Sequence, residues 1–289
     1  MRLHSFSLSS TVGLALVGLG GCVEPYVPAV LNAPTSFLVV DGFINGNGRT
    51  RISLSRTTNV AAATAPPIEK GAKLFIVDNT GSRYVLSERI PGSYQSDSLL
   101  LPTGRQYQLR ITTAGNAAYA SDLVPLKVTP VIDKLAWQLN EDKVAVNLNT
   151  HDDSQQSRFY RWSLVETWEF NAAYRSNLEY FPKPKPGFYR VDARVTPIYT
   201  CWRTERRSTI KQGSTAQLSR DALTDFTLVD ISTRAERLKI RYSVLVNQYA
   251  ETAEEFAYYD QLRKNTEAVG TVNDPLPSQL TGNVHRVDN

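Results

Sequence analysis

Short runs in which apolar and polar residues alternate, separated by turn-forming residues, extend along most of the chain. The run 37–44 is followed by Asn45-Gly46-Asn47-Gly48, and Asn-Gly between two such runs is a strong β-hairpin signal. The next run, 50–56, alternates as a strand with one face in water does. Further runs lie at 71–78, 84–86, 92–95 and 102–111. This pattern predicts a small antiparallel β-sandwich over residues 36–127, of the immunoglobulin-like or transthyretin-like kind.

A second β-rich unit is expected over residues 128–289. Pro125 and Pro130 fit an extended connector between the two units. The alternating runs 134–139 and 143–148 predict a hairpin. Later strands are expected at 159–168, 194–202, 226–229 and 238–249. The predicted fold class is therefore mainly β, with two antiparallel β-sandwich units.

One segment near the C-terminus has the pattern of a helix instead. Thr252-Ala253-Glu254-Glu255 is a capping box, in which the Thr and Glu side chains bond each other's backbone N–H groups. Phe256, Tyr259 and Leu262 then recur at helical spacing, and Gly270 suits the helix end. We predict a helix over residues 252–269, and we interpret its apolar stripe as core rather than a partner-binding face.

The first 21 residues are typical of a cleaved signal peptide. Residues 11–19 are apolar, follow a segment that carries Arg2, and are too few to span a bilayer. They lead into Leu19-Gly20-Gly21-Cys22, which resembles the lipobox of bacterial lipoproteins. We therefore predict lipid attachment to the thiol of Cys22, which makes the membrane the first expected partner.

The residues after Cys22 predict a tether and a location. Residues 22–35 contain several prolines and suit an extended spacer between lipid and folded domain. Val23 stands where some lipoproteins carry the aspartate that retains them in the inner membrane. We therefore expect an outer-membrane protein, with the periplasmic or surface-facing leaflet left open.

Charge and cysteine content exclude several classes of protein. The 289 residues include 32 Lys and Arg against 28 Asp and Glu, a net charge of +4 that is too small for a nucleic-acid binder. Once Cys22 is lipidated, Cys201 has no partner for an internal disulfide, and we interpret it as a buried strand cysteine. No paired set of zinc ligands occurs, and we expect neither metal nor cofactor.

The chain carries no recognisable catalytic motif. It lacks Gly-x-Ser-x-Gly, His-Glu-x-x-His and a phosphate-cradling Gly-rich loop. His151-Asp152-Asp153 is interpreted as a solvated turn, because adjacent residues do not converge on one ion without other ligands. A pair of carboxylates, as in a glycosidase, stays open because such partners meet only in the fold.

Aromatic and basic residues gather in the segment 171–190, which interrupts two predicted strands. A long loop of this kind in a compact domain is uncommon unless it is functional or disordered, and exposed aromatics beside lysines suit sugar stacking, peptide docking or a protein interface. The alternative is that its aromatics cover one end of the sandwich. The candidate binding surface comprises Tyr180, Phe181, Lys183, Lys185, Phe188 and Tyr189.

Several segments resemble the domain of unknown function 4249 (DUF4249) family of Bacteroidota. They are Cys22 with 38–44 and 52–57 near the N-terminus, and 241–249, 252–256 and 274–285 near the C-terminus. The resemblance implies an outer-membrane lipoprotein whose gene lies near that of a TonB-dependent transporter, with no agreed activity or functional residues. Family members usually continue into a further β segment after the equivalent of His285, so the resemblance also implies a shortened C-terminus.

The functional expectation is a non-catalytic accessory or binding lipoprotein of the outer membrane, beside a TonB-dependent transporter. One alternative is an envelope glycan hydrolase that uses carboxylates of the second unit. Another is a structural or adhesive module. Two close carboxylates in a pocket would favour the hydrolase, whereas an aromatic patch near Phe181 and Tyr189 would favour binding.

Overall fold

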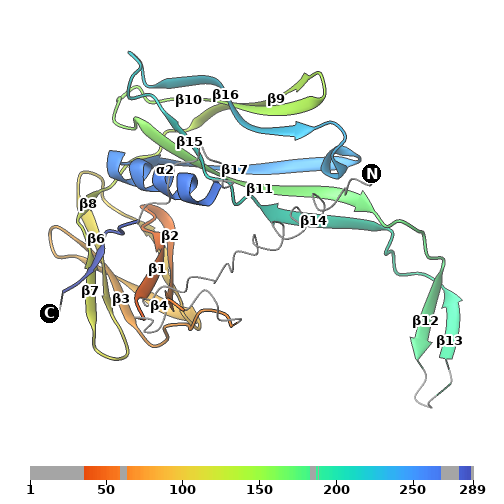
Figure 1. Ribbon diagram of the computed structural model, residues 1–289, viewed down its shortest axis with the longest axis horizontal. Helices are drawn as coiled ribbons and strands as arrows, with labels where there is room; N and C mark the ends of the chain where they lie inside the picture. Colours follow the sequence, from red (N-terminus) through yellow and green to blue (C-terminus); the bar gives the residue numbers. More distant parts are fainter. Residues whose placement is uncertain (1–35, 59–63, 183–186, 188, 268–279, 288–289) are drawn as a thin grey trace, which may run out of the picture.

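The computed structural model describes residues 36–58, 64–182, 187, 189–267 and 280–287, and Cys22 with its tether lies outside them. The described residues form antiparallel sheets, a short 3-10 helix and one α-helix, so the predicted mainly β fold class is confirmed (Figure 1). Within this part of the chain, no helix has the length and apolarity needed to cross a bilayer.

The first unit is one antiparallel sheet curved around its own core. Its first five strands are β1 (Leu38–Phe43), β2 (Asn47–Arg56), β3 (Lys73–Asp78), β4 (Arg83–Ile90) and β5 (Ser93–Leu100). Its last four strands are β6 (Gln106–Thr112), β7 (Ala118–Ser121), β8 (Val124–Pro125) and β18 (Val284–Arg286). The order is β1-β2-β5-β4-β3-β6-β7-β18, and β8 pairs with β6.

Alternation along the strands builds the core of this unit. Ile52 and Leu54 of β2, with Leu74 and Ile76 of β3, point to the enclosed face and are buried, whereas the intervening Ser53 and Phe75 are less buried. Tyr94 is also buried, and its hydroxyl donates to the Glu69 carbonyl at 3.0 Å. The sheet therefore closes around a core that follows the alternation in the sequence.

The last strand of the chain belongs to this first sheet. Val284 of β18 lies opposite Ser121 of β7 and packs against the first core. The sequence interpretation had assigned 128–289 to the second unit as a block. The structure differs because β18 pairs with the edge strand β7 and buries Val284 against the first core, a pairing between distant segments that no local pattern encodes.

The second unit is a sandwich of two antiparallel sheets. Its upper sheet has the order β16 (Ala222–Ser232), β10 (Lys143–His151), β9 (Ile132–Asn140). Its lower sheet is centred on β11 (Phe159–Asn171), which pairs on one side with β17 (Arg241–Glu251) and on the other with β15 (Lys211–Ser214) and β14 (Thr200–Arg206). Figure 1 shows the upper sheet lying over β11 and β17. The strand expected at 194–202 thus begins later, at Thr200.

Large side chains from both sheets fill the space between them. Trp162 of β11 is buried among Tyr160, Leu148 and Phe226, and its indole N–H donates to Gln248 Oε1 at 2.8 Å. A Cβ on Gly213 would lie 2.9 Å from the Trp162 ring, so only glycine fits there. Packing around one tryptophan therefore fixes the spacing of the sandwich.

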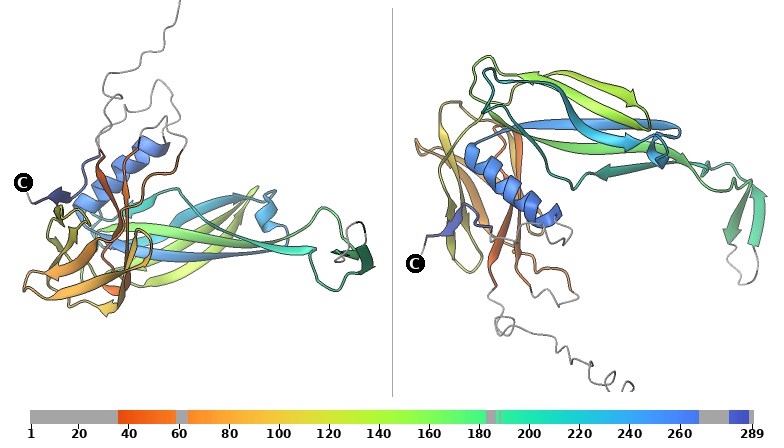
Figure 2. Two further views of the ribbon diagram at one scale, coloured as in Figure 1. Left: turned by 90° about the horizontal axis from the view of Figure 1, so that it is seen from below. Right: turned by 45° about the horizontal axis from the view of Figure 1, so that its top comes forward.

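Helix α2 (Ala253–Glu267) lies where the two units meet (Figure 2). The Thr252 N–H donates to Glu255 Oε2 at 2.9 Å and the Glu255 N–H to Thr252 Oγ1 at 3.2 Å, so the predicted capping box is confirmed. The Phe256 ring lies 5.1 Å from that of Phe159 on β11. Phe256 therefore packs on the lower sheet, and the Tyr259 ring lies 4.1 Å from the guanidinium of Arg161 on the same strand. No residue of the helix is fully buried, so its apolar stripe lies against the sheet without entering either core.

Candidate functional site

The aromatic segment forms a β-hairpin that stands apart from both units. Strand β12 (Leu178–Pro182) pairs with β13 (Tyr189–Ala193) in a sheet of their own, at the lower right of Figure 1. The sequence interpretation expected an irregular loop here. The signal for the hairpin is the alternation of apolar and polar residues in 178–182 and in 189–193, on either side of the Pro-Lys repeat. The interpretation considered only the number of aromatic residues in this segment and therefore missed it.

The register of the hairpin gives it two different faces. Directly opposed residues share a face, and Leu178 lies opposite Ala193 while Tyr180 lies opposite Val191. Tyr189 belongs to the same apolar face, and its ring lies 5.4 Å from that of Tyr180. Tyr180 and Tyr189 are 60% and 61% exposed, so nothing in the described part of the chain covers this face.

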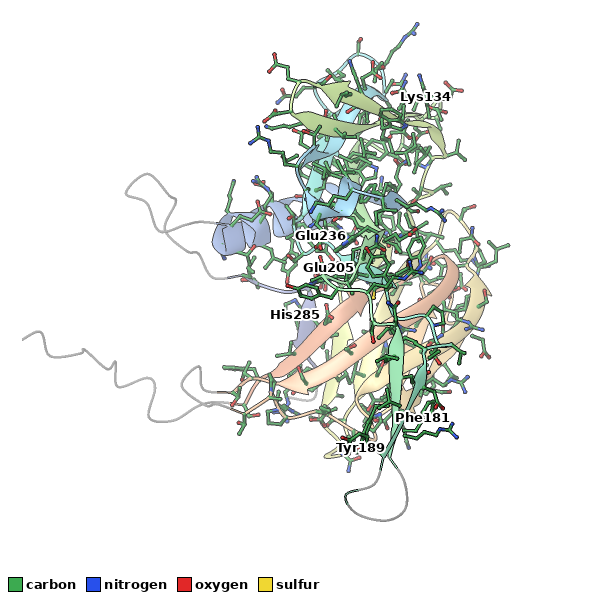
Figure 3. All side chains as sticks on the ribbon, turned by 90° about the vertical axis from the view of Figure 1, so that its right-hand side faces the viewer. Lys134, Phe181, Tyr189, Glu205, Glu236 and His285 are labelled. Carbon is green, nitrogen blue, oxygen red and sulfur yellow. The ribbon has the colours of Figure 1, made fainter. Side chains whose placement is uncertain are left out.

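The other face of the hairpin carries charged side chains that pair with their neighbours. Arg190 pairs with Asp192 at 2.6 Å, and Arg194 approaches Glu179 at 3.5 Å. Phe181 lies on this face beneath the guanidinium of Arg190, 5.4 Å from ring centroid to Cζ. The predicted surface is thus divided, because Phe181 points away from Tyr180 and Tyr189 (Figure 3).

Sequence reasoning named only part of the apolar face. Lys183, Lys185 and Phe188 lie outside the described residues. Leu178 and Val191 are exposed members of the face that sequence reasoning missed. The alternation Leu178, Tyr180 and Tyr189, Val191 is the signal that could have identified them.

A second exposed apolar strip lies on the edge strand β9. Trp137 lies opposite Val146, and Leu135 opposite Leu148, so both point to the core side of the upper sheet. Val146 and Leu148 are buried, yet Trp137 is 73% exposed. Strand β9 therefore extends past the edge of the lower sheet, which leaves its inner face uncovered.

A buried carboxylate lies at the edge of the second unit. Glu166 of β11 is 1% exposed and accepts hydrogen bonds from Arg207 Nε at 2.8 Å, Arg237 Nη1 at 2.9 Å and the Tyr242 hydroxyl at 2.8 Å. Burial alone disfavours the charged form, but the bonds from Tyr242, Arg237 and Arg207 outweigh it and hold the pKa of Glu166 below its ordinary value. Glu166 is therefore ionised and fully paired.

Glu166 and Glu205 are two close carboxylates that could form the catalytic pair of a hydrolase. They lie opposite each other on β11 and β14 and line one pocket of about 250 Å³. Glu205 is bonded to Arg203. A glycosidase needs one carboxylic acid with a raised pKa, whereas the pKa of Glu166 is lowered. Glu166 is therefore not the proton-donating member that such a pair requires.

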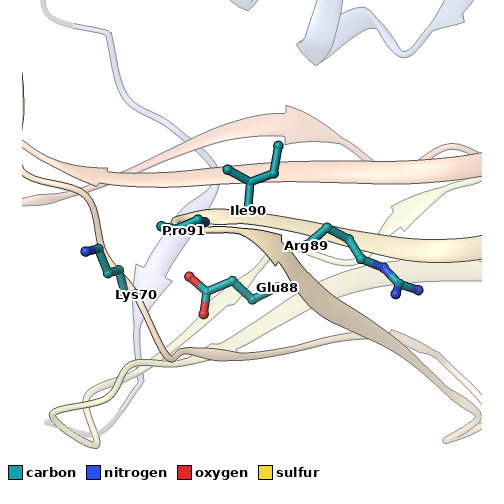
Figure 4. Close-up of a pocket in the computed structure, with 5 residues that line it drawn as sticks. All are labelled: Lys70, Glu88, Arg89, Ile90 and Pro91. Carbon is teal, nitrogen blue, oxygen red and sulfur yellow. The ribbon is translucent and has the colours of Figure 1, made fainter.

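A further pocket of about 280 Å³ in the first unit is built around Glu88 (Figure 4). Its carboxylate accepts the backbone N–H of Gly92 at 2.7 Å and that of Gly71 at 3.0 Å. These two bonds lower the pKa of Glu88. The carboxylate therefore ties two turns together.

His151 belongs to a small acidic group at the end of β10. Its Nδ1 lies 2.7 Å from Asp133, and its Nε2 lies 3.6 Å from Asp153. The hydrogen bond to Asp133, with the charge of that group, raises the pKa of His151. In the described residues no group of three or more His, Cys, Asp or Glu side chains is arranged to hold a metal ion. Cys201 is a free, half-buried thiol on β14.

Comparison with known sequences identifies the family but no characterised relative. The family model described as domain of unknown function (DUF4249) matches residues 23–289. No curated protein matches the chain.

Proposed function

The chain belongs to the DUF4249 family, and we propose that it is a non-catalytic, lipid-anchored binding protein of the outer membrane that docks a protein partner through hairpin β12–β13. The resemblance set out above makes a TonB-dependent transporter the expected partner. Lipid on Cys22 would hold the protein at the membrane, and residues 22–35 would serve as its tether.

The observation that carries the proposal is the uncovered apolar face of the hairpin. An isolated two-stranded hairpin is marginally stable in water unless a further surface packs on it. Tyr180 and Tyr189 offer large, rigid contact areas with a polar hydroxyl at the end, which is why tyrosine is enriched in interfaces. On the reverse face, the ion pair of Arg190 and Asp192 is exposed to water, whereas Glu179 and Arg194 are mostly buried. The geometry therefore favours one-sided docking.

A non-catalytic role is supported by the state of the best-placed acidic side chains. Glu166 is saturated with donors, and Glu88 holds two turns. A glycan hydrolase remains the second candidate only through the cross-strand pair of Glu166 and Glu205. In that reaction the ionised, fully paired Glu166 would not be the proton donor.

A matched pair of double variants on the hairpin tests the docking proposal. Tyr180→Ser with Val191→Ser removes the centre of the apolar face, whereas Glu179→Ser with Asp192→Ser removes the neighbouring cross-strand pair of the charged face. Each full-length protein is expressed in its native host, cross-linked in intact membranes, and purified for identification of bound proteins. We expect the first variant to lose its partner by about tenfold or more, as for central interface residues.

Two outcomes would refute this docking proposal. One is equal partner recovery with both double variants, and the other is recovery of the wild-type protein alone. The anchor is tested separately with Cys22→Ser, which should release the protein into the soluble fraction and abolish metabolic lipid labelling. Persistent labelling would contradict the assignment of Cys22.

A further inference from the structure

Two arginines beside Glu166 are held in fixed positions. The Arg207 N–H donates to the Leu164 carbonyl at 2.9 Å, which extends the β14 ladder by one residue, and its Nε donates to Glu166. Arg237 lies on the 3-10 helix η3 (Glu236–Leu238), with its Cζ 4.9 Å from the centroid of the Trp168 ring. The carboxylate of Glu166 therefore holds both guanidinium groups, with Arg207 fixed further through its backbone and Arg237 through the Trp168 ring.

Each anchored guanidinium keeps N–H groups that no described residue accepts. Arg207 uses only Nε and Arg237 only Nη1 in hydrogen bonds to Glu166. A guanidinium has five N–H donors in a rigid plane. Because one carboxylate neutralises only one of the two positive charges, the group carries an uncompensated charge with its donors already oriented.

These donors line the pocket of about 250 Å³ at the end of β14. The lining residues are Glu166, Glu205, Arg206, Arg207, Ser208, Thr209 and Arg237. Three arginines thus face two carboxylates, and Glu205 is already bonded to Arg203 outside the lining. Ser208 and Thr209 are exposed at its rim and add hydroxyl donors. The pocket is polar, positively charged and rich in donors.

We propose that this pocket binds a small oxyanion, the carboxylate or phosphate group of a solute, between Arg207 and Arg237. Planar guanidinium groups suit such oxyanions because two parallel N–H···O bonds match their geometry. The volume is below the roughly 300 to 1,000 Å³ of sites that enclose drug-sized ligands, so it fits a head group rather than a large cofactor. Glu166 acts as a positioning residue, because its carboxylate accepts hydrogen bonds from both arginines and so fixes their orientation.

The pocket is separate from hairpin β12–β13, the proposed docking element. The hairpin precedes Thr200 at the start of β14, whereas the pocket follows Arg206 at its other end. Loss of partner binding by the hairpin variants therefore leaves oxyanion binding unchanged, and the two ideas fail separately.

A charge series at the pocket rim tests the proposal without disturbing Glu166. Isothermal titration calorimetry of the full-length protein, in non-ionic detergent and phosphate-free buffer, is carried out with inorganic phosphate and separately with acetate at constant ionic strength. We expect saturable binding, which should be weaker when the titrations are repeated at a higher KCl concentration. Ser208→Glu should weaken binding about tenfold, because one negative charge is placed at the pocket, and Ser208→Lys should strengthen it.

The control is Ser98→Glu, which adds the same charge at an exposed position of β5 in the other unit. Binding of phosphate alone, of acetate alone or of both supports the site and identifies its preferred oxyanion. The proposal is overturned if neither anion binds at millimolar concentration. It is also overturned if Ser208→Glu has no effect, or if Ser98→Glu weakens binding as much as Ser208→Glu does.

Discussion

Replacing Trp162 by alanine should remove a large part of the stability of the second unit. Trp162 is 2% exposed, packs between Tyr160 and Phe226, and donates to Gln248. Loss of a buried aromatic ring costs about 3 to 5 kcal/mol, through lost transfer free energy and the cavity that remains. Gln248 Oε1 also loses its donor, which costs about 1 kcal/mol unless water replaces it. We therefore expect the free energy of unfolding to fall by about 4 kcal/mol or more.

Trp137 provides the matched control in the same sandwich. Its side chain points to the core side of the upper sheet but is 73% exposed, so Trp137→Ala should change the free energy of unfolding by less than about 0.5 kcal/mol. Both variants are compared with wild type by urea unfolding followed by circular dichroism, with the slopes checked for equality. Equal losses of stability would refute the reasoning, since they would mean that the β9 strip is covered.

Three further changes follow from the polar contacts. Glu166→Gln should lower the free energy of unfolding by about 3 kcal/mol in urea titrations, because two arginines lose a buried ionised acceptor; an unchanged midpoint would contradict this. Thr252→Ala should cost about 1 kcal/mol by loss of the cap to Glu255, and the helical dichroism signal should weaken first. Asp133→Asn should return the pKa of His151 toward its ordinary 6.5 in an NMR titration. In wild type this contact stabilises the fold below that pH and is lost as pH rises through the raised pKa, so a stabilising effect confined to high pH would refute it.

Local patterns were sufficient where the bonds that form a structure are local. The capping box at Thr252 joins residues three apart, and both of its predicted bonds are present. At the first hairpin the Asn47 N–H donates to Asn45 Oδ1 at 3.0 Å, two residues away. Strand β2 follows its alternation because a pleated strand presents successive side chains to opposite faces.

The candidate site was only partly accessible to the same reasoning. The exposed tyrosines were identified by their chemistry, but the separation of Phe181 from Tyr180 depends on the register with β13. Arg207 and Arg237 lie 41 and 71 residues from Glu166 in sequence, and each belongs to an ordinary charged segment. Their convergence had no signal in any one of those segments.

By itself the sequence determined the strand-rich character, the capped helix and the lipobox-like segment, because each depends on neighbouring residues or on a fixed period. The tertiary structure decided which strands share a sheet, and so placed β18 beside β7, a strand far from it in sequence. It also decided which apolar side chains are covered, since Trp162 and Trp137 look alike in alternating strands. Burial depends on what the rest of the chain places opposite a residue, and that is not a local property.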